Sequence, residues 1–405
     1  GVTHIGDWAF QHCEALTSIE IPDSVTSIGD EAFMRCNSLK NIIMRGGVTD
    51  IGNHAFTFCL SLVSITLSSC LRRIGDGAFW FCKSLESIII PDSVTTLGNG
   101  AFSTCRSLKS ITLPKGITRI SPNSFAACRS LASISIPDSV TRIDNGAFDG
   151  CSSLVNITIP DSVTSIGNRA FGYCMSLASI EIPDSVTYIG DEAFANCTSL
   201  TNITIPDSVS SIGKGAFSGC ESLVSVKIPH GVVRIGDGAF QDCKSLASIE
   251  IPDSVMSIGD KAFKSCKSLK NIIMRDGVTS IGETAFRGCD SLTSIELPDS
   301  ITSIGDGAFV RCKSLKNITL PNGVARIGSG TFAVCCSLKG ITIPDGVTSI
   351  EDNAFKSCSS LANIEIPSSV TSIGNGAFYE CKSLNKDVRD EIAQRFGSDV
   401  FKSIF

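Results

Sequence analysis

Cysteine is the reactive residue that stands out in this sequence, because it occurs nineteen times among 405 residues. Thiols at suitable spacings form disulfides or bind zinc. Seventeen of the nineteen fall in one register at steps of 23 residues, from Cys13 to Cys381, and only Cys70 and Cys336 lie outside it. Disulfide scaffolds are short and irregularly spaced, and no Cys-x-x-Cys pair occurs here. We therefore interpret the column as buried thiols that form no disulfide, with disulfides as the alternative and zinc as the weakest interpretation.

Histidines and carboxylates give little support to catalysis. No glycine-rich phosphate loop opens a full helix, and paired carboxylates recur wherever the repeat places them, so they carry no specific signal. We expect a non-enzymatic protein without catalytic residues, cofactors or a metal site. The four histidines are scattered: His4, His12, His54 and His230.

A row of aspartates has the composition of a cation site. Asp138, Asp161, Asp184 and Asp207 follow one another at steps of 23 residues, in the Pro-Asp-Ser turns of successive copies. Like charges about 5 Å apart repel and favour a cation or a basic partner. The alternative is a solvated rim with nearby lysines.

Bulky apolar residues occupy positions where other copies carry small or polar residues. They lie beside residues 44–47 and 68–71, where the Pro-Asp-Ser turn is lost in two successive copies. Exposed clusters of this kind often mark contacts, and aromatic residues are typical anchors. We predict a partner-binding patch there, with local packing over a distorted turn or contact with a missing N-terminal cap as the alternative. The patch consists of Met34, Phe58, Trp80 and Phe81.

Exposed positions of the predicted strands form a second candidate surface. The residue between the paired apolar positions of each copy faces away from the core, because side chains alternate along a strand. This row is polar and low in charge, so it suits a glycan or an extended protein surface. A Ser/Asn ladder two positions earlier is explained first by hydrogen bonds along the stack. The candidate contacts are Thr158, Glu181, Thr204, Lys227 and Glu250.

All of these residues are positioned by one repeat of 23 residues. Phenylalanine recurs from Phe10 to Phe378 without a gap, which makes seventeen copies. A fixed period between about 20 and 50 residues is the signature of a solenoid, in which each repeat packs only on its neighbours. In the first copies, Ile19 and Ile21 alternate as in a strand, and Pro22 ends it. Residues 31–36 have helical spacing after Asp30, which suits an N-cap.

The repeat predicts an α/β solenoid with a parallel sheet on the concave side of a curved stack and short helical turns opposite. Residues 1–384 are expected to form this single array. Residues 385–405 leave the repeat, and residues 387–396 have the pattern of an amphipathic helix that Gly397 ends. Val400, Phe401, Ile404 and Phe405 continue the apolar signal. We predict a C-terminal helical cap, with a partner-binding tail as the alternative.

The pattern Leu-x-x-Ile-x-Ile-Pro-x-x-Val-x-x-Ile-Gly-x-x-Ala-Phe-x-x-Cys resembles the BspA-like leucine-rich repeat family. The resemblance covers residues 1 to about 384 and rests on about ten positions in each copy. It implies a leucine-rich repeat solenoid of a bacterial or protist surface protein that binds host matrix or plasma proteins, or other cells. The family shares no catalytic motif that transfers to this chain.

Composition narrows the range of partners. Apolar residues make up 42% and charged residues 18%, so disorder is not expected. The net charge of −6 argues against general nucleic-acid binding. No apolar run approaches the ~20 residues of a membrane span. The chain starts inside a repeat and shows no signal peptide; removal of a signal peptide or N-terminal cap before Gly1 is one interpretation, and an uncapped N-terminal coil is the other.

We predict a non-enzymatic binding scaffold, an adhesin-like protein at the cell surface or secreted, that recognises a protein or glycan of a host or a neighbouring cell. The alternative is an intracellular structural component that self-assembles or joins a larger particle through its solenoid ends. In that case the uncapped N-terminal coil is the expected site of self-association.

Overall fold

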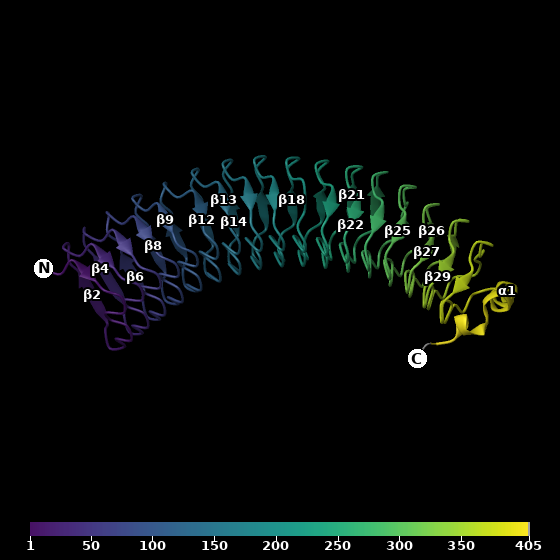
Figure 1. Ribbon diagram of the computed structural model, residues 1–405, viewed down its shortest axis with the longest axis horizontal. Coiled ribbons are helices and arrows are strands. Elements are labelled where there is room, and N and C mark those ends of the chain that lie inside the picture. The colour runs from purple at the N-terminus through teal and green to yellow at the C-terminus, as the bar shows by residue number, and fades with distance from the viewer. Residues whose placement is uncertain (404–405) are drawn as a thin grey trace. The chain divides into compact units, whose positions relative to one another are not determined.

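Each 23-residue repeat forms one turn of a solenoid in the computed structural model, which describes residues 1–403 (Figure 1). The chain divides into two compact units, residues 1–208 and 209–405, each described in turn below. Strands at the same position of successive repeats pair in parallel, and partners lie 23 residues apart, as with Ser87 and Ser110. The predicted class of fold, a parallel-strand solenoid of the leucine-rich repeat type, is confirmed.

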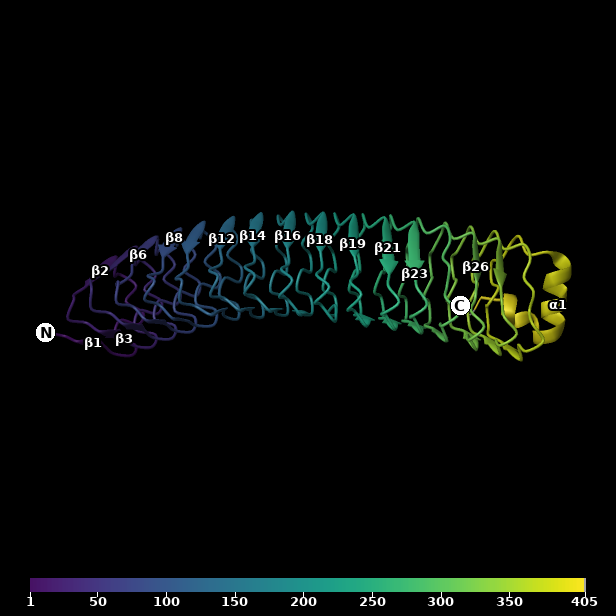
Figure 2. The ribbon, with the colours of Figure 1, turned by 90° about the horizontal axis from the view of Figure 1, so that it is seen from above.

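In unit 1 each complete turn carries a longer and a shorter strand, on opposite sides of the stack (Figure 2). The longer strands are β2 (Ser18–Ile21), β4 (Asn41–Met44), β6 (Ser64–Thr66), β8 (Ser87–Ile89), β10 (Ser110–Thr112), β12 (Ser133–Ser135), β14 (Asn156–Thr158), β16 (Ser179–Glu181) and β18 (Asn202–Thr204). The shorter strands are β1 (His4–Ile5), β3 (Ser27–Ile28), β5 (Asp50–Ile51), β7 (Arg73–Ile74), β9 (Thr96–Leu97), β11 (Arg119–Ile120), β13 (Arg142–Ile143), β15 (Ser165–Ile166) and β17 (Tyr188–Ile189).

Unit 2 repeats this arrangement and ends in two helices. Its longer strands are β19 (Ser225–Lys227), β21 (Ser248–Ile251), β23 (Asn271–Met274), β26 (Asn317–Thr319) and β28 (Gly340–Thr342). Its shorter strands are β20 (Arg234–Ile235), β22 (Ser257–Ile258), β24 (Ser280–Ile281), β25 (Ser303–Ile304), β27 (Arg326–Ile327), β29 (Ser349–Ile350) and β30 (Ser372–Ile373). The helices are α1 (Lys386–Phe396) and the 3₁₀ helix η1 (Ser398–Phe401).

A stack of phenylalanine rings runs through the core of each unit. Adjacent rings are nearly parallel, with centroids 4.9 to 5.9 Å apart in unit 1 and 5.3 to 5.6 Å apart in unit 2. Rings inside the stack, such as Phe79, have no exposed surface. Offset aromatic pairs contribute about 0.5–1.5 kcal/mol beyond the burial of their area. The stack therefore ties every turn to the turns before and after it.

The cysteine column lies beside the ring stack and confirms the prediction of buried thiols. Most of its thiols donate to the carbonyl oxygen of a phenylalanine 26 residues earlier, as from Cys82 Sγ to Phe56 at 3.2 Å, whereas Cys13 at the start of the column is exposed. No disulfide joins any of the nineteen cysteines. Burial disfavours the thiolate, so it raises the pKa of Cys36 to about 11 and that of Cys381 to about 12. The pKa of Cys82 lies further above the usual value for the same reason.

Residues 31–36, expected as one turn of helix, form a run of tight turns instead. Glu31 and Arg35 have left-handed backbone conformations, with φ of 54° and 63°. The N–H of Phe33 donates to the carbonyl oxygen of Ala55 in the next turn at 2.7 Å. Alternate N–H groups of the segment therefore point along the stack, which a helix does not allow. The four-residue spacing that suggested a helix arises because both side chains face the core.

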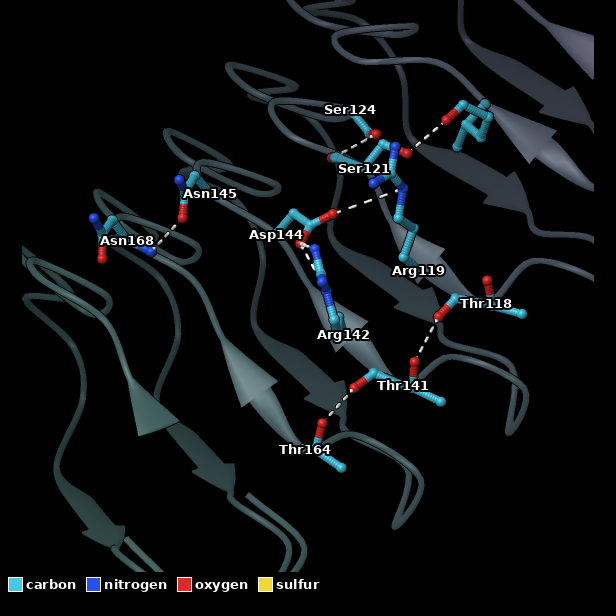
Figure 3. Close-up of polar contacts among 11 residues, drawn as sticks. Thr118, Arg119, Ser121, Ser124, Thr141, Arg142, Asp144, Asn145, Thr164 and Asn168 are labelled. Atoms are coloured by element: carbon cyan, nitrogen blue, oxygen red, sulfur yellow. Dashed lines mark hydrogen bonds and ion pairs between the residues drawn. The ribbon is translucent and has the colours of Figure 1, made fainter. Parts of the chain in front are cut away.

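The Asp or Asn expected as a helix N-cap has a different acceptor role. Its side-chain oxygen accepts the backbone N–H of the residue 23 positions later, as from Asn53 to Asp30 at 2.6 Å. Figure 3 shows the same contact between Asn145 and Asn168, at 2.8 Å. The column thus bonds neighbouring turns together. The N–H groups that a cap would satisfy in a helix are here bonded to the adjacent turn.

A second polar ladder runs along the shorter strands of unit 1. The hydroxyl of Thr141 donates to the carbonyl oxygen of Thr118 at 3.1 Å, and Thr164 repeats the contact to Thr141 at 3.2 Å (Figure 3). Nearby, Asp144 replaces the glycine of other repeats and pairs with Arg142 at 2.8 Å. These contacts are structural, because each satisfies a group that stacking brings close to its counterpart in the next turn.

The C-terminal segment completes the last turn of unit 2. The N–H groups of Gly376 and Phe378 donate to Asp399 and Val400 of η1, at 3.0 and 2.8 Å. The 3₁₀ helix η1 therefore accepts the bonds that a further repeat would accept, while Gly397 follows α1, as predicted. Among the predicted apolar residues of α1, only Ile392 is fully buried. Ile404 and Phe405, which were also expected in the cap, lie outside the described residues.

The thiol column predicts a loss of stability in alkaline solution. Sixteen of the thiols are buried, and a buried thiol ionises at a higher pH than the same thiol in the unfolded chain. Its stabilising contribution is complete below the unfolded pKa of about 9 and is lost as pH rises toward the folded pKa. The free energy of unfolding should therefore fall above about pH 9, by about 1.4 kcal/mol per pH unit for each thiol exposed. Denaturant titrations between neutral and alkaline pH measure this slope.

A variant with alanine at three successive buried positions of the column, Cys128, Cys151 and Cys174, is the control. Alanine keeps most of the packing but removes three titrating groups, so the alkaline slope should be shallower. An unchanged slope in this variant would show that other groups cause the loss of stability.

Candidate binding surface

Bulky side chains occupy a left-handed position in two successive repeats of unit 1. Phe58 and Phe81 have φ of 60° and 66°; other repeats hold glycine at the same position, with φ of 74° at Gly150, or a smaller side chain, with φ of 63° at Thr104. A side chain with a Cβ costs about 1–2 kcal/mol in this conformation. Because the position is left-handed in every repeat of unit 1, the surrounding repeat fixes this strain, and it does not distinguish Phe58 and Phe81 from the other repeats. The sequence pattern gave no sign of this feature.

The rings of Phe58, Trp80 and Phe81 form one aromatic cluster, as the sequence predicted. The centroid of Phe58 lies 5.3 Å from Trp80 and 4.8 Å from Phe81, and Trp80 and Phe81 meet edge to face at 5.9 Å. All three side chains are partly exposed. His54 adds a fourth ring at 6.3 Å from Trp80, and its Nδ1 lies 3.2 Å from the hydroxyl of Thr57.

Met34, the fourth residue of the predicted patch, makes a different contact. Its sulfur accepts a hydrogen bond from the side-chain amide of Gln11 at 3.7 Å, and its side chain is partly exposed. The ring contacts of the aromatic cluster do not include it. From here on, the aromatic cluster means Phe58, Trp80 and Phe81.

Three cations flank the aromatic cluster. The guanidinium of Arg35 lies over the ring of Phe58, 5.6 Å from its centroid. The ammonium of Lys83 and the guanidinium of Arg106 lie over Phe81, at 4.7 and 5.9 Å. These residues could not be singled out from the sequence, because single Lys and Arg residues recur throughout the repeat. The signal that could have found them is their register next to the aromatic column.

The longer strands of unit 1 place two predicted contacts in one depression. Thr158 on β14 and Glu181 on β16 are exposed and line a hollow of about 470 Å³. Asp161 and Asp184, from the aspartate row, line the same hollow. Thr204 on β18 is exposed and pairs in register with Glu181. The depression is rich in hydrogen-bonding groups, as predicted for this face.

In unit 2 the predicted contacts Lys227 and Glu250 are also exposed, on β19 and β21. The carboxylate of Glu250 is paired with Arg275 at 2.7 Å, and this hydrogen bond raises the pKa of the guanidinium. Glu250 is therefore neutralised by its own chain. Lys227 is the better candidate of the two for contact with a partner.

The described residues, 1–403, contain no group of three or more His, Cys, Asp or Glu side chains placed to hold a metal ion. The aspartate row therefore does not converge on one point in the way that a metal centre requires. No helix in this part of the chain is long and apolar enough to cross a membrane.

Stacked parallel turns with a buried ring column and variable outer positions define a leucine-rich repeat protein. The chain belongs to the family of the BspA type leucine rich repeat region, whose model matches residues 3–132, 118–247, 187–306, 233–362 and 279–404. This family is described by its repeat. The resemblance found in the sequence is thereby confirmed.

The chain is similar to solved structures of bacterial proteins. The chain is 32% identical to a leucine-rich repeat protein from Bacteroides ovatus, with a TM-score of 0.70 over 90% of this chain and 87% of that one. It is also 32% identical to a leucine rich cell surface protein from Faecalibacterium prausnitzii, over 81% of this chain and 87% of that one, with a TM-score of 0.49. The comparison with curated proteins found no match.

A pair of substitutions tests whether the aromatic cluster belongs to the surface or to the core. In Phe81→Gly, relief of the left-handed strain offsets the lost ring contacts, so the free energy of unfolding should change by at most about 1.5 kcal/mol. In Phe79→Ala, a cavity opens inside the ring stack and the loss should be about 3–5 kcal/mol. Urea denaturation of both variants measures the difference. A comparable loss in both would assign Phe81 to the core.

Proposed function

We propose that this protein is a non-enzymatic binding scaffold of the adhesin type, which recognises proteins or glycans of a host or a neighbouring cell. The observation that carries the proposal is the aromatic cluster, in which the rings of Phe58 and Phe81 meet Trp80 and all three side chains are partly exposed. Surface aromatic residues are typical anchors of binding interfaces. The ring stack and the thiol column already hold the turns together, so core packing alone does not require these rings.

The depression lined by Thr158, Glu181, Asp161 and Asp184 supports a second contact region within unit 1. A solenoid presents the same position from successive turns, so a partner can make one small contact on each turn. Side chains of this face offer hydrogen bonds rather than apolar anchors. We assign it to specificity, and the aromatic cluster to affinity.

A location at the cell surface or outside the cell accompanies this proposal. Its support is the family, since the BspA-like resemblance implies surface proteins that contact host molecules or other cells. Protease treatment of intact cells that produce the chain tests this location. Cleavage of the chain before any cytoplasmic marker would support it, and full protection would contradict it.

Binding assays with a double variant test the role of the aromatic cluster. The whole chain would be presented to immobilised purified matrix and plasma proteins and to printed glycans. Trp80→Ser combined with Phe81→Ser removes two anchors and should weaken the strongest binding at least about tenfold, because each anchor contributes about 1 kcal/mol or more.

Tyr173→Ser is the matched control for this assay. Tyr173 occupies the same left-handed position in another repeat of unit 1 but lies apart from the aromatic cluster. Its substitution should leave binding within about twofold of the original. The proposal is contradicted if no probe binds, or if the double variant binds as tightly as the original chain. Circular dichroism and the melting temperature of each variant confirm that it is folded.

A further inference from the structure

The cations beside the aromatic cluster have no acidic partner. Within residues 1–403, none of the ion pairs includes Arg35, Lys83 or Arg106. Arg129 occupies the same position as Lys83 and Arg106, one turn further along the stack. It is exposed and, within residues 1–403, has no ion pair either. Lys83, Arg106 and Arg129, named the cation row here, thus carry positive charges that nothing in the described chain neutralises.

In unit 2, two of the four lysines at the same position are neutralised. Lys244 pairs with Glu221 at 2.6 Å, and Lys313 pairs with Asp290 at 3.2 Å. In both cases the acid occupies the same position one repeat earlier. In unit 1 the residue one repeat before Lys83 is Leu60, so no acid is present. The repeat can therefore place an acid beside this cation, and in unit 1 it does not.

The surrounding sequence is basic although the whole chain is acidic. Residues 31–130 contain eleven Lys and Arg residues but five Asp and Glu residues, a net charge of +6, whereas the chain carries −6. A local excess of one sign attracts partners of the opposite sign and raises their rate of encounter. The partner of this region is therefore expected to be anionic.

Within the aromatic cluster, the ring of Phe81 holds two of the cations in place. Lys83 and Arg106 both lie within 6 Å of the centre of Phe81, at 4.7 and 5.9 Å. Such cation–π contacts stabilise an exposed charge by about 0.5–1 kcal/mol. They also restrict long flexible side chains before binding, which lowers the entropy cost of contact. Because cations cover Phe81, it is a poor platform for stacking nucleobases, which need an open ring face.

We propose that the cation row binds the sulfate or carboxylate groups of an anionic glycan. This inference rests on the proposed function and names the chemistry of its ligand. The row offers one cation per turn, and the turns beneath it are 5.2 to 5.9 Å apart, as measured between the rings of Phe79, Phe102 and Phe125. The length of one sugar unit along a glycan chain is about equal to the distance between successive turns. Successive charged sugars can therefore contact successive cations of the row.

An acidic peptide fits this spacing less well. Side chains on one face of an extended peptide are about 6.6–6.8 Å apart, so its carboxylates drift out of register with the row within a few turns. Long nucleic acids extend beyond the row and meet the acidic remainder of the chain. A short sulfated oligosaccharide matches both the spacing and the extent of the cation row.

Calorimetric titration of the whole chain tests the proposal with four probes. They are a fully sulfated heparin-type hexasaccharide, the same sugar after desulfation, a hexaglutamate peptide and a single-stranded DNA hexamer. We expect binding of the sulfated sugar that weakens as sodium chloride is raised, because exposed charges are screened. Equal or tighter binding of the desulfated sugar, the peptide or the DNA would overturn the assignment.

Paired variants separate the cation row from general charge. Lys83→Gln with Arg106→Gln should weaken binding of the sulfated sugar at least about tenfold, as expected for two charge-assisted contacts. Lys244→Gln with Lys313→Gln removes the same charge at the same repeat position in unit 2 and should change it less than about twofold. Equal losses in both pairs would overturn the proposal.

Phe81→Leu keeps every charge but removes the ring beneath two cations. This substitution should weaken binding of the sulfated sugar about threefold, because the ring no longer fixes the position of the two cations. No loss would overturn the role of the ring. If binding to the panel of proteins and glycans depends on Trp80 and Phe81 but the sulfated sugar does not bind, this inference is contradicted and the proposed function stands. If the panel shows no such dependence, the proposed function falls instead.

Discussion

Hydrogen bonds between turns are the constraint on which the rest of this structure depends. The N–H of Phe33 is satisfied by Ala55 of the next turn and the thiol of Cys82 by Phe56 of the turn before it. A single repeat would leave these donors and acceptors open, and unpaired buried polar groups cost about 1–3 kcal/mol each. Stability therefore belongs to pairs of adjacent turns. This explains why the last turn of unit 2 ends on the carbonyl groups of η1.

The positions that are buried in every repeat could be predicted from the sequence, whereas the path of the backbone between them could not. The 23-residue steps of Phe and Cys fixed the fold class and the buried column, because only a stack buries the same residue in every copy. Residues 31–36 were expected to be helical because two core-facing side chains four residues apart look alike in a helix and in a run of turns. The left-handed backbone of residues such as Glu31 and Arg35 distinguishes a run of turns from a helix. Glutamate and arginine are not residue types that indicate a left-handed conformation.

The candidate site shows the same division. Phe58, Trp80 and Phe81 were found because they interrupt a regular column, and their rings do meet. Met34 was grouped with them by proximity in the repeat, although its sulfur accepts a hydrogen bond from Gln11 instead. The flanking cations escaped notice because their role depends on how far a long side chain reaches and on which acids are absent. Spacing along a sequence does not encode either property.

Identical bonding between turns also bears on how such a chain can change in length. The ion pair from Glu20 to Arg45 across β2 and β4 recurs between Glu250 and Arg275 across β21 and β23, ten repeats later. Both pairs join residues 25 positions apart, as a copied block would. Most turns offer their neighbours the same backbone donors and acceptors, so unequal crossing-over in steps of 23 codons leaves most bonds across the new junction in place. The gene can thus lengthen, shorten or exchange recognition surfaces while the scaffold beneath them stays bonded.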